Sequence, residues 1–290
     1  MRTDTGVDVR RIRLVASDVD GTLLDPHGRL SLRMRTAIQS VTASGVTVAL
    51  ATARRWTGAA LAASEFDFRG PLIIFDGAMT RAYPDGEVLE NIPLDRAIAQ
   101  RSAEAMLSYG LQPIIQFCDQ RTEVLRVAEE VAHPEWTAHY LDVFREQIRF
   151  CPAAGLCDVA PDPMRLVAFA PVSILRRAAV DLGGLGSGRQ LLLTGNYGMA
   201  ELTIFAPDAS KGKALATLAR RLGIALDETM AVGDGLNDIS MLRAAGLGVA
   251  MGHAPRRVRA SADVVTTSNA EDGLARALET FILGAEQSGG

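Results

Sequence analysis

Short apolar segments alternate with amphipathic segments over the first quarter of the chain. The apolar runs cover residues 13–17, 46–51 and 71–75 and contain few polar residues. Short, nearly continuous apolar runs are typical of parallel strands that are covered on both faces. Between the runs, helical spacing predicts helices over 31–45 and 56–64. The first has Ser31 as a candidate N-cap and an apolar face made of Met34, Ala37, Ile38 and Val41.

The same alternation returns after residue 207. The pattern predicts helices over 211–222, 238–245 and 272–283, and strands over 228–232, 248–251 and 262–266. Strands that alternate with helices indicate an α/β fold. We therefore expect a doubly wound, Rossmann-like core with a parallel sheet, built from residues 1–82 and 207–290.

The middle of the chain has a different character. Residues 83–86 carry the turn signal Tyr-Pro-Asp-Gly, and helical and strand patterns then follow in no regular alternation. The pattern predicts helices over 94–108, 122–132 and 172–182, and strands over 113–117, 164–169 and 201–205. We interpret residues 83–206 as an α+β module inserted into the core.

Composition narrows the classes of protein that this chain can belong to. With 290 residues, 48% of them hydrophobic, it can bury one large core or two smaller ones. The net charge of −4 and the scattered arginines argue against a nucleic-acid partner. No segment approaches the roughly 20 apolar residues of a membrane span, and residues 1–11 lack the apolar stretch of a signal peptide. We expect a cytoplasmic protein with no membrane partner, whose three cysteines are simple buried or half-buried thiols.

The segment with the strongest chemical signal follows the first apolar run. Asp18 and Asp20 lie two residues apart there, and Gly21 permits a sharp reversal of the chain. In an extended segment both carboxylates project to the same side. They can bind a hard cation such as Mg2+, or serve as a nucleophile and a proton donor. The alternative for an isolated Asp-x-Asp is a turn capped by aspartate.

Lysine usage gives a second signal. Of the 30 basic residues only Lys211 and Lys213 are lysine, and every other one is arginine. A lysine delivers a compact point charge, whereas arginine offers a broad planar fork. We interpret Lys211 as functional and Lys213 as a solvated residue at the start of a helix.

Four polar loops follow predicted core strands or begin core helices. They cover residues 18–22, 52–54, 210–212 and 233–238. In open parallel sheets, such loops meet outside the carboxyl ends of the strands. Together they supply carboxylates, a hydroxyl, an amide and an ammonium, which suits a phosphate held beside Mg2+.

These motifs, in this order around an insertion of this size, resemble the haloacid dehalogenase-like superfamily. The match is to its Cof-type phosphatases, which carry a large C2-type cap after the third core strand. The resemblance covers nearly the whole chain and includes residues 250–252, 262–266 and 271–273. It implies a phosphatase that acts on small phosphorylated metabolites, such as sugar phosphates or a cofactor phosphate, with the inserted cap determining the substrate.

The resemblance implies a mechanism residue by residue. Asp18 attacks the phosphorus, and Asp20 first protonates the leaving oxygen and then deprotonates the hydrolytic water. Mg2+ is held by the Asp18 carboxylate, the backbone carbonyl of Asp20 and Asp234.

The resemblance also assigns the remaining polar residues of the loops. Those implied to contact the phosphoryl group are Thr52, Lys211, Asn237 and the backbone N–H groups around Val19 and Ala53. Asp238 lies behind the metal and orients its waters or Lys211. Each assignment has an alternative, because Thr52 and Asn237 are also suitable helix N-caps and Asp238 a suitable first-turn acid.

Three residues depart from the family pattern. Ala53 stands where glycine is usual, which narrows the backbone geometry. His253 replaces an asparagine, for which we expect little consequence. Asp76 replaces an asparagine at the entrance to the cap, and its extra carboxylate needs a partner, such as Arg54 or an arginine of the cap. We hypothesise that Asp76 alters substrate choice or cap closure.

Two other functions stay open at this point. One is a phosphomutase of the same superfamily, which returns the phosphoryl group to a sugar. The other is a non-catalytic sensor of phosphorylated ligands, which would not need both Asp18 and Asp20. In the cap, Arg145, Arg149 and Arg165 either meet an anionic substrate or are solvated surface charges.

Overall fold

The computed structural model describes residues 12–119, 122–131, 135–182, 188–192 and 200–284. The chain divides into two compact units. Unit 1 consists of Met1–Glu90 and Ser210–Gly290, and unit 2 of Asn91–Ala209. Both boundaries lie later in the chain than the expected 82/83 and 206/207. At the first of them, one further strand, Val88–Asn91, joins the sheet of unit 1 before the chain enters unit 2.

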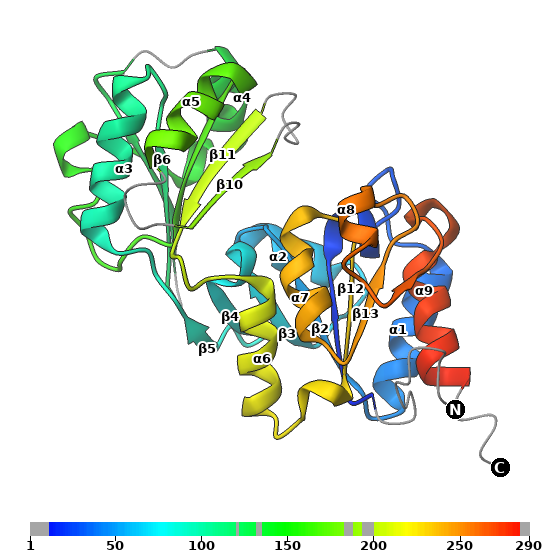
Figure 1. Cartoon of the computed structure of the whole chain (residues 1–290). Helices are drawn as coiled ribbons and strands as arrows, with labels where there is room; N and C mark the ends of the chain where they lie inside the picture. The colour runs from blue at the N-terminus through cyan, green and yellow to red at the C-terminus, as the bar shows by residue number, and fades with distance from the viewer. Residues whose placement is uncertain (1–11, 120–121, 132–134, 183–187, 193–199, 285–290) are drawn as a thin grey trace. The chain divides into compact units, whose positions relative to one another are not determined.

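Unit 1 is built on an eight-stranded sheet (Figure 1). Its spatial order is β14-β13-β12-β1-β2-β3-β4-β5. The strands are β1 (Leu14–Ser17), β2 (Thr47–Ala51), β3 (Gly70–Ile74), β4 (Met79–Tyr83), β5 (Val88–Asn91), β12 (Thr229–Gly233), β13 (Leu247–Ala250) and β14 (Val264–Val265). Pairing is parallel from β14 to β3 and antiparallel between β3 and β4. The predicted parallel core is therefore confirmed, with an antiparallel extension at one edge.

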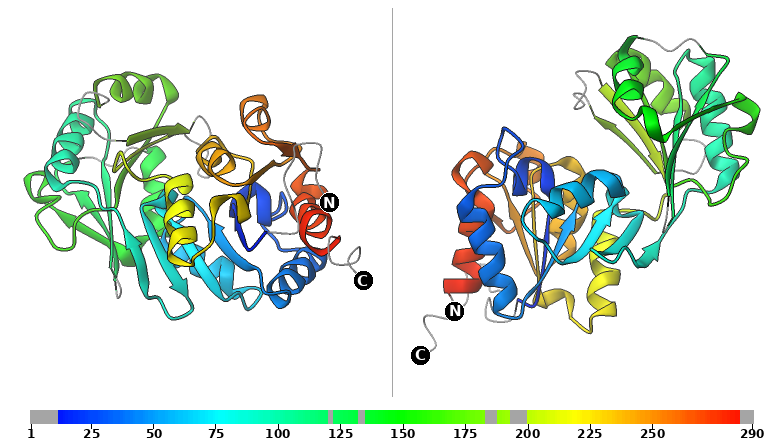
Figure 2. Two further views of the ribbon diagram at one scale, coloured as in Figure 1. Left: turned by 60° about the horizontal axis from the view of Figure 1, so that its bottom comes forward. Right: turned by 180° about the vertical axis from the view of Figure 1, so that it is seen from behind.

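The helices of unit 1 follow the predicted pattern, except that α8 (Arg256–Arg259) was not predicted. They are α1 (Leu32–Ala43), α2 (Trp56–Ser64), α6 (Lys211–Arg221), α7 (Ile239–Ala244), α8 (Arg256–Arg259) and α9 (Gly273–Leu278), the last continued by a turn over Glu279–Leu283. Helix α1 buries the four apolar residues of its predicted face, and Ser31 Oγ accepts a hydrogen bond from the backbone N–H of Met34 at 3.0 Å. Helices α1 and α9 lie side by side on the same side of the sheet (Figures 1 and 2).

Unit 2 has its own six-stranded sheet, in the order β10-β11-β9-β6-β7-β8. The strands are β6 (Ile114–Cys118), β7 (Glu123–Ala128), β8 (Ile148–Cys151), β9 (Arg165–Ala170), β10 (Gly188–Leu192) and β11 (Ala200–Phe205). Helices α3 (Arg96–Ser108) and α5 (Val172–Leu182) pack on one face around a core that includes Met106 and Leu175. Helix α4 (Glu135–Val143) covers the other face, where Tyr140 packs against Phe169.

One predicted element of unit 2 is wrong. The helix expected over 122–132 is the strand β7, and α4, β8 and β10 were not predicted. Val124, Val127 and Val131 have helical spacing, but the segment pairs with β6 on one side and β8 on the other. Pairing with two neighbours outweighs a local pattern, and β-branched valines fit a strand well.

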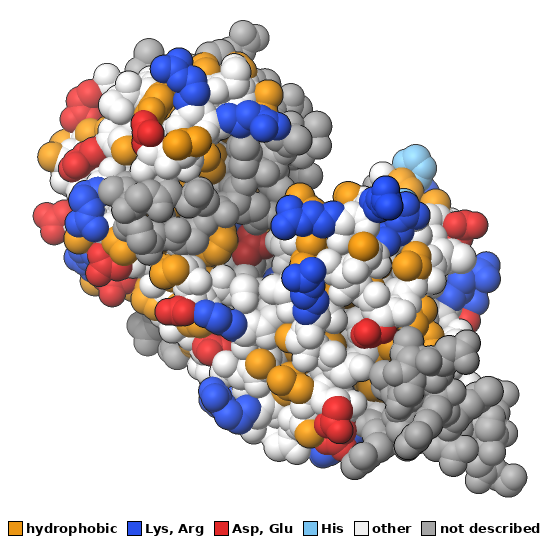
Figure 3. All heavy atoms as spheres, viewed as in Figure 1, with side chains coloured by type: hydrophobic (Ala, Val, Ile, Leu, Met, Phe, Trp, Pro, Cys, Tyr) orange, Lys and Arg blue, Asp and Glu red, His pale blue; other side chains and the backbone are white. Residues whose placement is uncertain are grey.

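The surface of unit 1 and unit 2 carries charged side chains of both signs (Figure 3). Among the described residues on the face seen in Figure 3, basic and acidic side chains are interspersed, so this face carries no extended patch of one sign. The described helices do not combine the length and apolarity needed to cross a membrane. The three cysteines are buried free thiols, two of them in the core beneath α3 and α5.

Candidate active site

The candidate residues lie at one edge of the unit 1 sheet. Asp18 follows β1, Thr52 follows β2, Asp76 follows β3 and Asp234 follows β12. These four strands are neighbours in the sheet and run parallel, so their carboxyl ends meet at the same edge. The backbone N–H of Asp18 donates to the carbonyl of Val232 at 2.9 Å, which ties the two central loops together.

Lys211 forms the centre of the site. Its ammonium Nζ lies 2.6 Å from Asp18 Oδ1 and 2.6 Å from Asp238 Oδ1. The lysine side chain has no exposed surface, and the two carboxylate side chains are 8% and 1% exposed. Lys211 is the first residue of α6, where Ser210 Oγ caps the helix by accepting from the N–H of Lys213. The sequence analysis distinguished Lys211 from Lys213, and the structure agrees, because Lys211 is buried and Lys213 is exposed.

The electrostatics of this cluster follow from burial and close charges. Burial raises the pKa of the Asp18 carboxyl well above its usual range, Asp238 and Asp234 add to the rise, and Lys211 opposes it. For Lys211, burial alone would lower the pKa of the ammonium, but the carboxylates of Asp18, Asp238 and Asp76 outweigh it and raise that pKa. Several carboxylates thus face one ammonium, so the cluster suits a further cation.

Asp234 is held by contacts from three other segments. Its Oδ1 accepts from the hydroxyl of Thr22 at 3.1 Å, and its Oδ2 lies 3.4 Å from Nε2 of His253. Asp238 Oδ2 accepts from the backbone N–H groups of Asp234 and Gly235 at 3.0 and 2.7 Å. Burial raises the pKa of Asp234, the Asp238 carboxylate adds to the rise, and Thr22 and His253 lower that pKa.

Gly21 makes the close approach of Asp234 possible. A Cβ at Gly21 would lie 2.5 Å from Asp234 Oδ2, and the glycine has a φ of +85°. Both the space and the backbone conformation therefore require glycine here. The chain reversal that the sequence predicted at this residue brings β1 and β12 loops into contact.

The oxygens of the cluster fit a divalent cation. Asp18, Asp234 and Asp238 each offer a carboxylate oxygen, and these atoms lie within 4.8 Å of one another. Oxygen-only donors of this kind are those that Mg2+ prefers. Because Asp238 already accepts from Lys211 and from two backbone N–H groups, Asp18 and Asp234 are the better ligands of the three.

Asp20 forms an ion pair that the sequence did not predict. Arg54 Nε and Nη2 donate to Asp20 Oδ2 and Oδ1 at 2.9 and 2.7 Å, so the guanidinium binds the carboxylate in a bidentate manner. Arg54 also donates to the carbonyl of Gly58 at 3.1 Å. The side chains are 30% exposed for the arginine and 47% for the aspartate. The arginine that we considered as a partner for Asp76 thus binds Asp20.

Asp76 and Asn237 form a second unpredicted pair. Asn237 Nδ2 donates to Asp76 Oδ1 at 2.8 Å. Helix α7 has Asp238, and not Asn237, as its N-cap residue. The N-cap alternative for Asn237 is therefore wrong, because its side chain points instead to the loop after β3.

Thr52, Ala53 and Val19 lie on the loops after β1 and β2. Thr52 is 1% exposed, and its Oγ1 accepts from the backbone N–H of Arg54 at 3.0 Å, which forms a turn before α2. Its N-cap alternative is wrong, since the N-cap of α2 is Arg55. Ala53 does not adopt a positive φ, so an alanine in place of glycine is compatible with this backbone. Val19 is buried in the turn that carries Asp20.

The structure therefore brings the predicted residues of unit 1 together, and it adds Arg54, Thr22 and His253. His253 Nδ1 accepts from the backbone N–H of Asn269 at 3.4 Å, which leaves Nε2 as the protonated nitrogen facing Asp234. Its place in the sequence, as the departure from a family asparagine, was the only available signal. The contact with Asp234 argues against our expectation that His253 is of little consequence.

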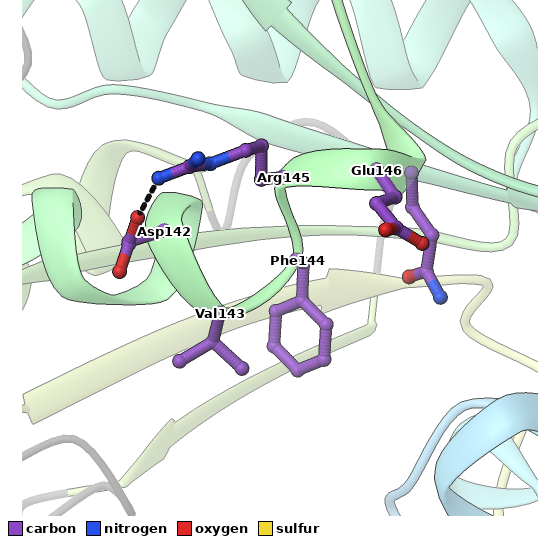
Figure 4. Close-up of a pocket in the computed structure, with 6 residues that line it drawn as sticks. Asp142, Val143, Phe144, Arg145 and Glu146 are labelled. Atoms are coloured by element: carbon purple, nitrogen blue, oxygen red, sulfur yellow. Dashed lines mark hydrogen bonds and ion pairs between the residues drawn. The ribbon is translucent and has the colours of Figure 1, made fainter.

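Unit 2 contains a shallow pocket of about 260 Å³ (Figure 4). One short segment, residues 142–147, lines it, and it contains none of the residues predicted for catalysis. Arg145 Nη2 forms an ion pair there with Asp142 Oδ1 at 2.6 Å. Of the three arginines considered as substrate contacts, Arg145 and Arg149 are exposed, whereas Arg165 is 7% exposed and donates to Gln116 Oε1 at 2.8 Å. The solvated alternative is therefore wrong for Arg165.

Comparison with known proteins identifies a family that this chain matches. The family model for haloacid dehalogenase-like hydrolases matches residues 15–147 and 191–278. These ranges include every residue of the candidate site described above.

Individual relatives match over nearly the whole chain. Phosphatase YwpJ of Bacillus subtilis is 28% identical and aligns over 93% of this chain and all of its own. From the same organism, 5-amino-6-(5-phospho-D-ribitylamino)uracil phosphatase YcsE is 27% identical, over 94% of this chain and 96% of its own. A solved structure of a haloacid dehalogenase-like hydrolase from B. subtilis superimposes with a TM-score of 0.76 at 26% identity, covering 92% of this chain and 99% of that one.

Proposed function

The chain belongs to the haloacid dehalogenase-like hydrolases, and from this premise we propose that it is a Mg2+-dependent phosphatase of small phosphorylated metabolites. The observation that carries the proposal is the buried Lys211 ammonium, 2.6 Å from both Asp18 and Asp238, beside the carboxylate of Asp234. A phosphate dianion cannot approach an aspartate nucleophile unless positive charge offsets their repulsion.

Asp18 is the proposed nucleophile. One of its carboxylate oxygens forms a bond to phosphorus while the ester oxygen leaves with the bonding electrons, which gives a phosphoryl-aspartate and an alcohol. A water molecule then attacks the same phosphorus, and the bond from phosphorus to Asp18 breaks. This divides one difficult displacement into two easier ones.

Asp20 is the proposed general acid and base. It gives its proton to the leaving oxygen in the first step and takes a proton from the attacking water in the second. A protonated carboxyl carries no charge and has fewer free acceptor sites than the carboxylate that binds the guanidinium here. The bidentate pair with Arg54 is therefore weakened when Asp20 takes up the proton that it gives to the leaving oxygen.

The other polar residues bind and position the phosphoryl group. Thr52, Asn237 and Lys211 would contact it, together with the backbone N–H groups around Val19 and Ala53. Asp238 positions Lys211 and the Asp234 loop through the hydrogen bonds described above. Such preorganised donors, aimed at charge that develops in the transition state, account for much of the rate of phosphoryl transfer.

The proposed cation site consists of Asp18, Asp234 and the backbone carbonyl of Asp20. Mg2+ bound there would neutralise phosphate charge beside the nucleophile. The carboxylate oxygens within 4.8 Å of one another support this assignment.

Sugar phosphates and phosphorylated cofactors or their precursors are the proposed substrate class. The activity for which the relative YcsE is named, on a phosphoribityl compound, supports this class. We propose that unit 2, which differs in fold from the hydrolytic core, selects among such compounds.

Replacement of the nucleophile tests the function. With Mg2+ and p-nitrophenyl phosphate or a panel of phosphorylated metabolites, we expect Asp18→Asn to lose at least about a thousandfold in kcat. Its circular dichroism and melting should stay close to wild type, because asparagine keeps the shape and an acceptor for Lys211. Turnover by Asp18→Asn at a near-normal rate would contradict the assignment. Release of inorganic phosphate separates hydrolysis from the phosphomutase alternative, in which a hexose phosphate isomer forms instead, and from a sensor, which releases none.

A further inference from the structure

Asp76 occupies a rigid position between two loops of the site. It is 5% exposed, lies two residues after the end of β3 and has the left-handed backbone conformation φ +56°, ψ +27°. Its backbone N–H donates to the carbonyl of Thr52 at 3.2 Å. Aspartate tolerates this conformation better than most residues, though at a cost in strain. Burial of the side chain and its hydrogen bond from Asn237 restrict the positions that the carboxylate can take.

The contact with Asp76 determines which end of the Asn237 side-chain amide faces the loop after β3. Asn237 Nδ2 lies 2.8 Å from Asp76 Oδ1. A carboxylate can only accept hydrogen bonds, whereas the two ends of an asparagine amide, one donor and one acceptor, are nearly identical in shape. The carboxylate therefore selects the orientation in which the NH2 group of Asn237 faces the loop after β3. An asparagine at residue 76 could pair with either end of the amide.

The charge of Asp76 is offset within the same cluster. The carboxylate acts on Lys211 together with Asp18 and Asp238 and favours its ammonium form. The negative charge of Asp76 is thus partly offset by the buried ammonium of Lys211. Its repulsion of a phosphate is therefore smaller than that of an isolated carboxylate.

We propose that Asp76 is a positioning residue, which fixes the side-chain amide of Asn237 so that an N–H of its NH2 group points to the phosphoryl group. The inference rests on the proposed function, in which Asn237 contacts that group. It also explains how a carboxylate can be accommodated at residue 76. By accepting one N–H of the Asn237 amide, Asp76 excludes the flipped orientation of that amide and leaves its second N–H available for the phosphoryl group.

Four variants test this role. Asp76→Gly removes the carboxylate and suits the left-handed backbone, so it should fold. Asp76→Asn keeps a side chain of the same shape, with an acceptor but also a donor. Asn237→Ala removes the amide, and the double variant Asp76→Gly/Asn237→Ala completes a double-mutant cycle. The measurements are kcat/KM for p-nitrophenyl phosphate or the best ester of a panel, the inhibition constant of inorganic phosphate, and thermal melting.

We expect Asp76→Gly and Asn237→Ala each to lower kcat/KM by roughly 10- to 100-fold, the effect of one hydrogen bond to a charged group. The double variant should be no worse than about threefold below Asn237→Ala, because the carboxylate acts through the amide. Both single variants should weaken inhibition by inorganic phosphate by similar factors. Asp76→Asn should lie between wild type and Asp76→Gly, since its amide permits both orientations.

Other outcomes overturn the inference. These are an Asp76→Gly variant as active as wild type, effects of the two single variants that multiply in the double variant, or an Asp76→Asn variant that is more active than wild type on all esters. Failure of the proposed function would look different: wild type would release no phosphate from any ester, or Asp18→Asn would be as active as wild type. That result would remove this inference as well, whereas an active wild type with multiplying effects removes the inference alone.

Discussion

At the scale of the residue, the two lysines of the chain show how strongly position determines the role of a side chain. Lys211 has no exposed surface and lies between two buried carboxylates, whereas Lys213, two residues later on the same helix, is exposed. A buried carboxylate without a counter-charge is very costly, whereas an exposed charge contributes little even when it has a partner. The same residue type should therefore give opposite results when it is replaced.

We expect Lys211→Met to lower the free energy of unfolding by about 3–5 kcal/mol, because Asp18 and Asp238 lose their cation while they stay buried. The matched variant Lys213→Met should stay within about 0.5 kcal/mol of wild type. Urea unfolding followed by circular dichroism measures both. Equal effects of the two substitutions would show that the buried ion pairs do not contribute as described.

His253 gives a prediction about the metal. Its Nε2 contacts Asp234 Oδ2 at 3.4 Å, so we expect His253→Ala to raise the Mg2+ concentration for half-maximal activity by about tenfold, as for other residues that orient a metal ligand. We also expect Mg2+ to raise the melting temperature of the wild type, and His253→Ala to need a similar increase in Mg2+ concentration for the same rise. His27→Ala is the control, because His27 is exposed on another loop. Unchanged Mg2+ titrations in His253→Ala would contradict the positioning of Asp234.

The sequence was sufficient to predict the site residues that directly follow a parallel strand. Asp18, Thr52 and Asp234 each follow a parallel strand, so the topology alone brings them together. Their hydrogen-bond partners could not be predicted. Asp20 binds Arg54, 34 positions away, and Asp76 binds Asn237, 161 positions away. A local sequence pattern does not indicate contacts between residues so far apart in the chain.

At the scale of the element, Gly77 shows why the loop after β3 fits against α6. A Cβ at Gly77 would lie 2.3 Å from the backbone of Ser210, and its φ is +96°. Gly45, after α1, has a similar φ of +88°, but an added Cβ there would meet nothing within 4 Å. Substitution of Gly45 therefore measures the cost of the left-handed backbone alone, whereas substitution of Gly77 adds the cost of a steric clash with Ser210.

We expect Gly45→Ala to cost about 1 kcal/mol of stability, the price of a left-handed alanine. Gly77→Ala should cost at least about 2 kcal/mol more, since the loop or α6 must shift. It should also lower kcat, because α6 begins with Lys211. Melting of both variants, with turnover of phosphate esters, tests this. Equal stability losses would mean that the loop can move away from α6 without penalty.

The elements differ in how far the local sequence determines them. In α1, the N-cap and the apolar face agree with the tertiary structure, and every expected buried residue is buried. In β7, helical spacing of valines conflicts with the pairing to β6 and β8, and the pairing prevails. The bounds of a strand that depends on neighbours distant in sequence cannot be derived from its own residues.

At the scale of the whole molecule, the sequence indicated an interrupted core, and the structure places the interruption at Glu90/Asn91 and Ala209/Ser210. The expected boundary came earlier because the turn at 83–86 was interpreted as the exit from the core. In the structure that turn joins β4 to β5, which both extend the sheet of unit 1.

Unit 2 should fold by itself. It has its own sheet, with buried apolar clusters on both faces, so its stability does not depend on strands from unit 1. We expect the excised fragment 91–209 to show a mixed helix and strand spectrum by circular dichroism and a single cooperative melting transition. A fragment that melts without cooperativity would show that unit 2 needs the rest of the chain.

The strand order of unit 1 also bears on how the protein emerges from the ribosome. Strand β1 lies between β2 and β12, and β12 is encoded more than two hundred residues later. Translation proceeds at about 5–20 residues per second, and domains generally fold as units. One flank of β1, with the proposed nucleophile Asp18 at its end, must therefore wait tens of seconds for a partner while the inserted unit is synthesised and folds first. A nascent chain with such an open flank is the kind of species that chaperones bind.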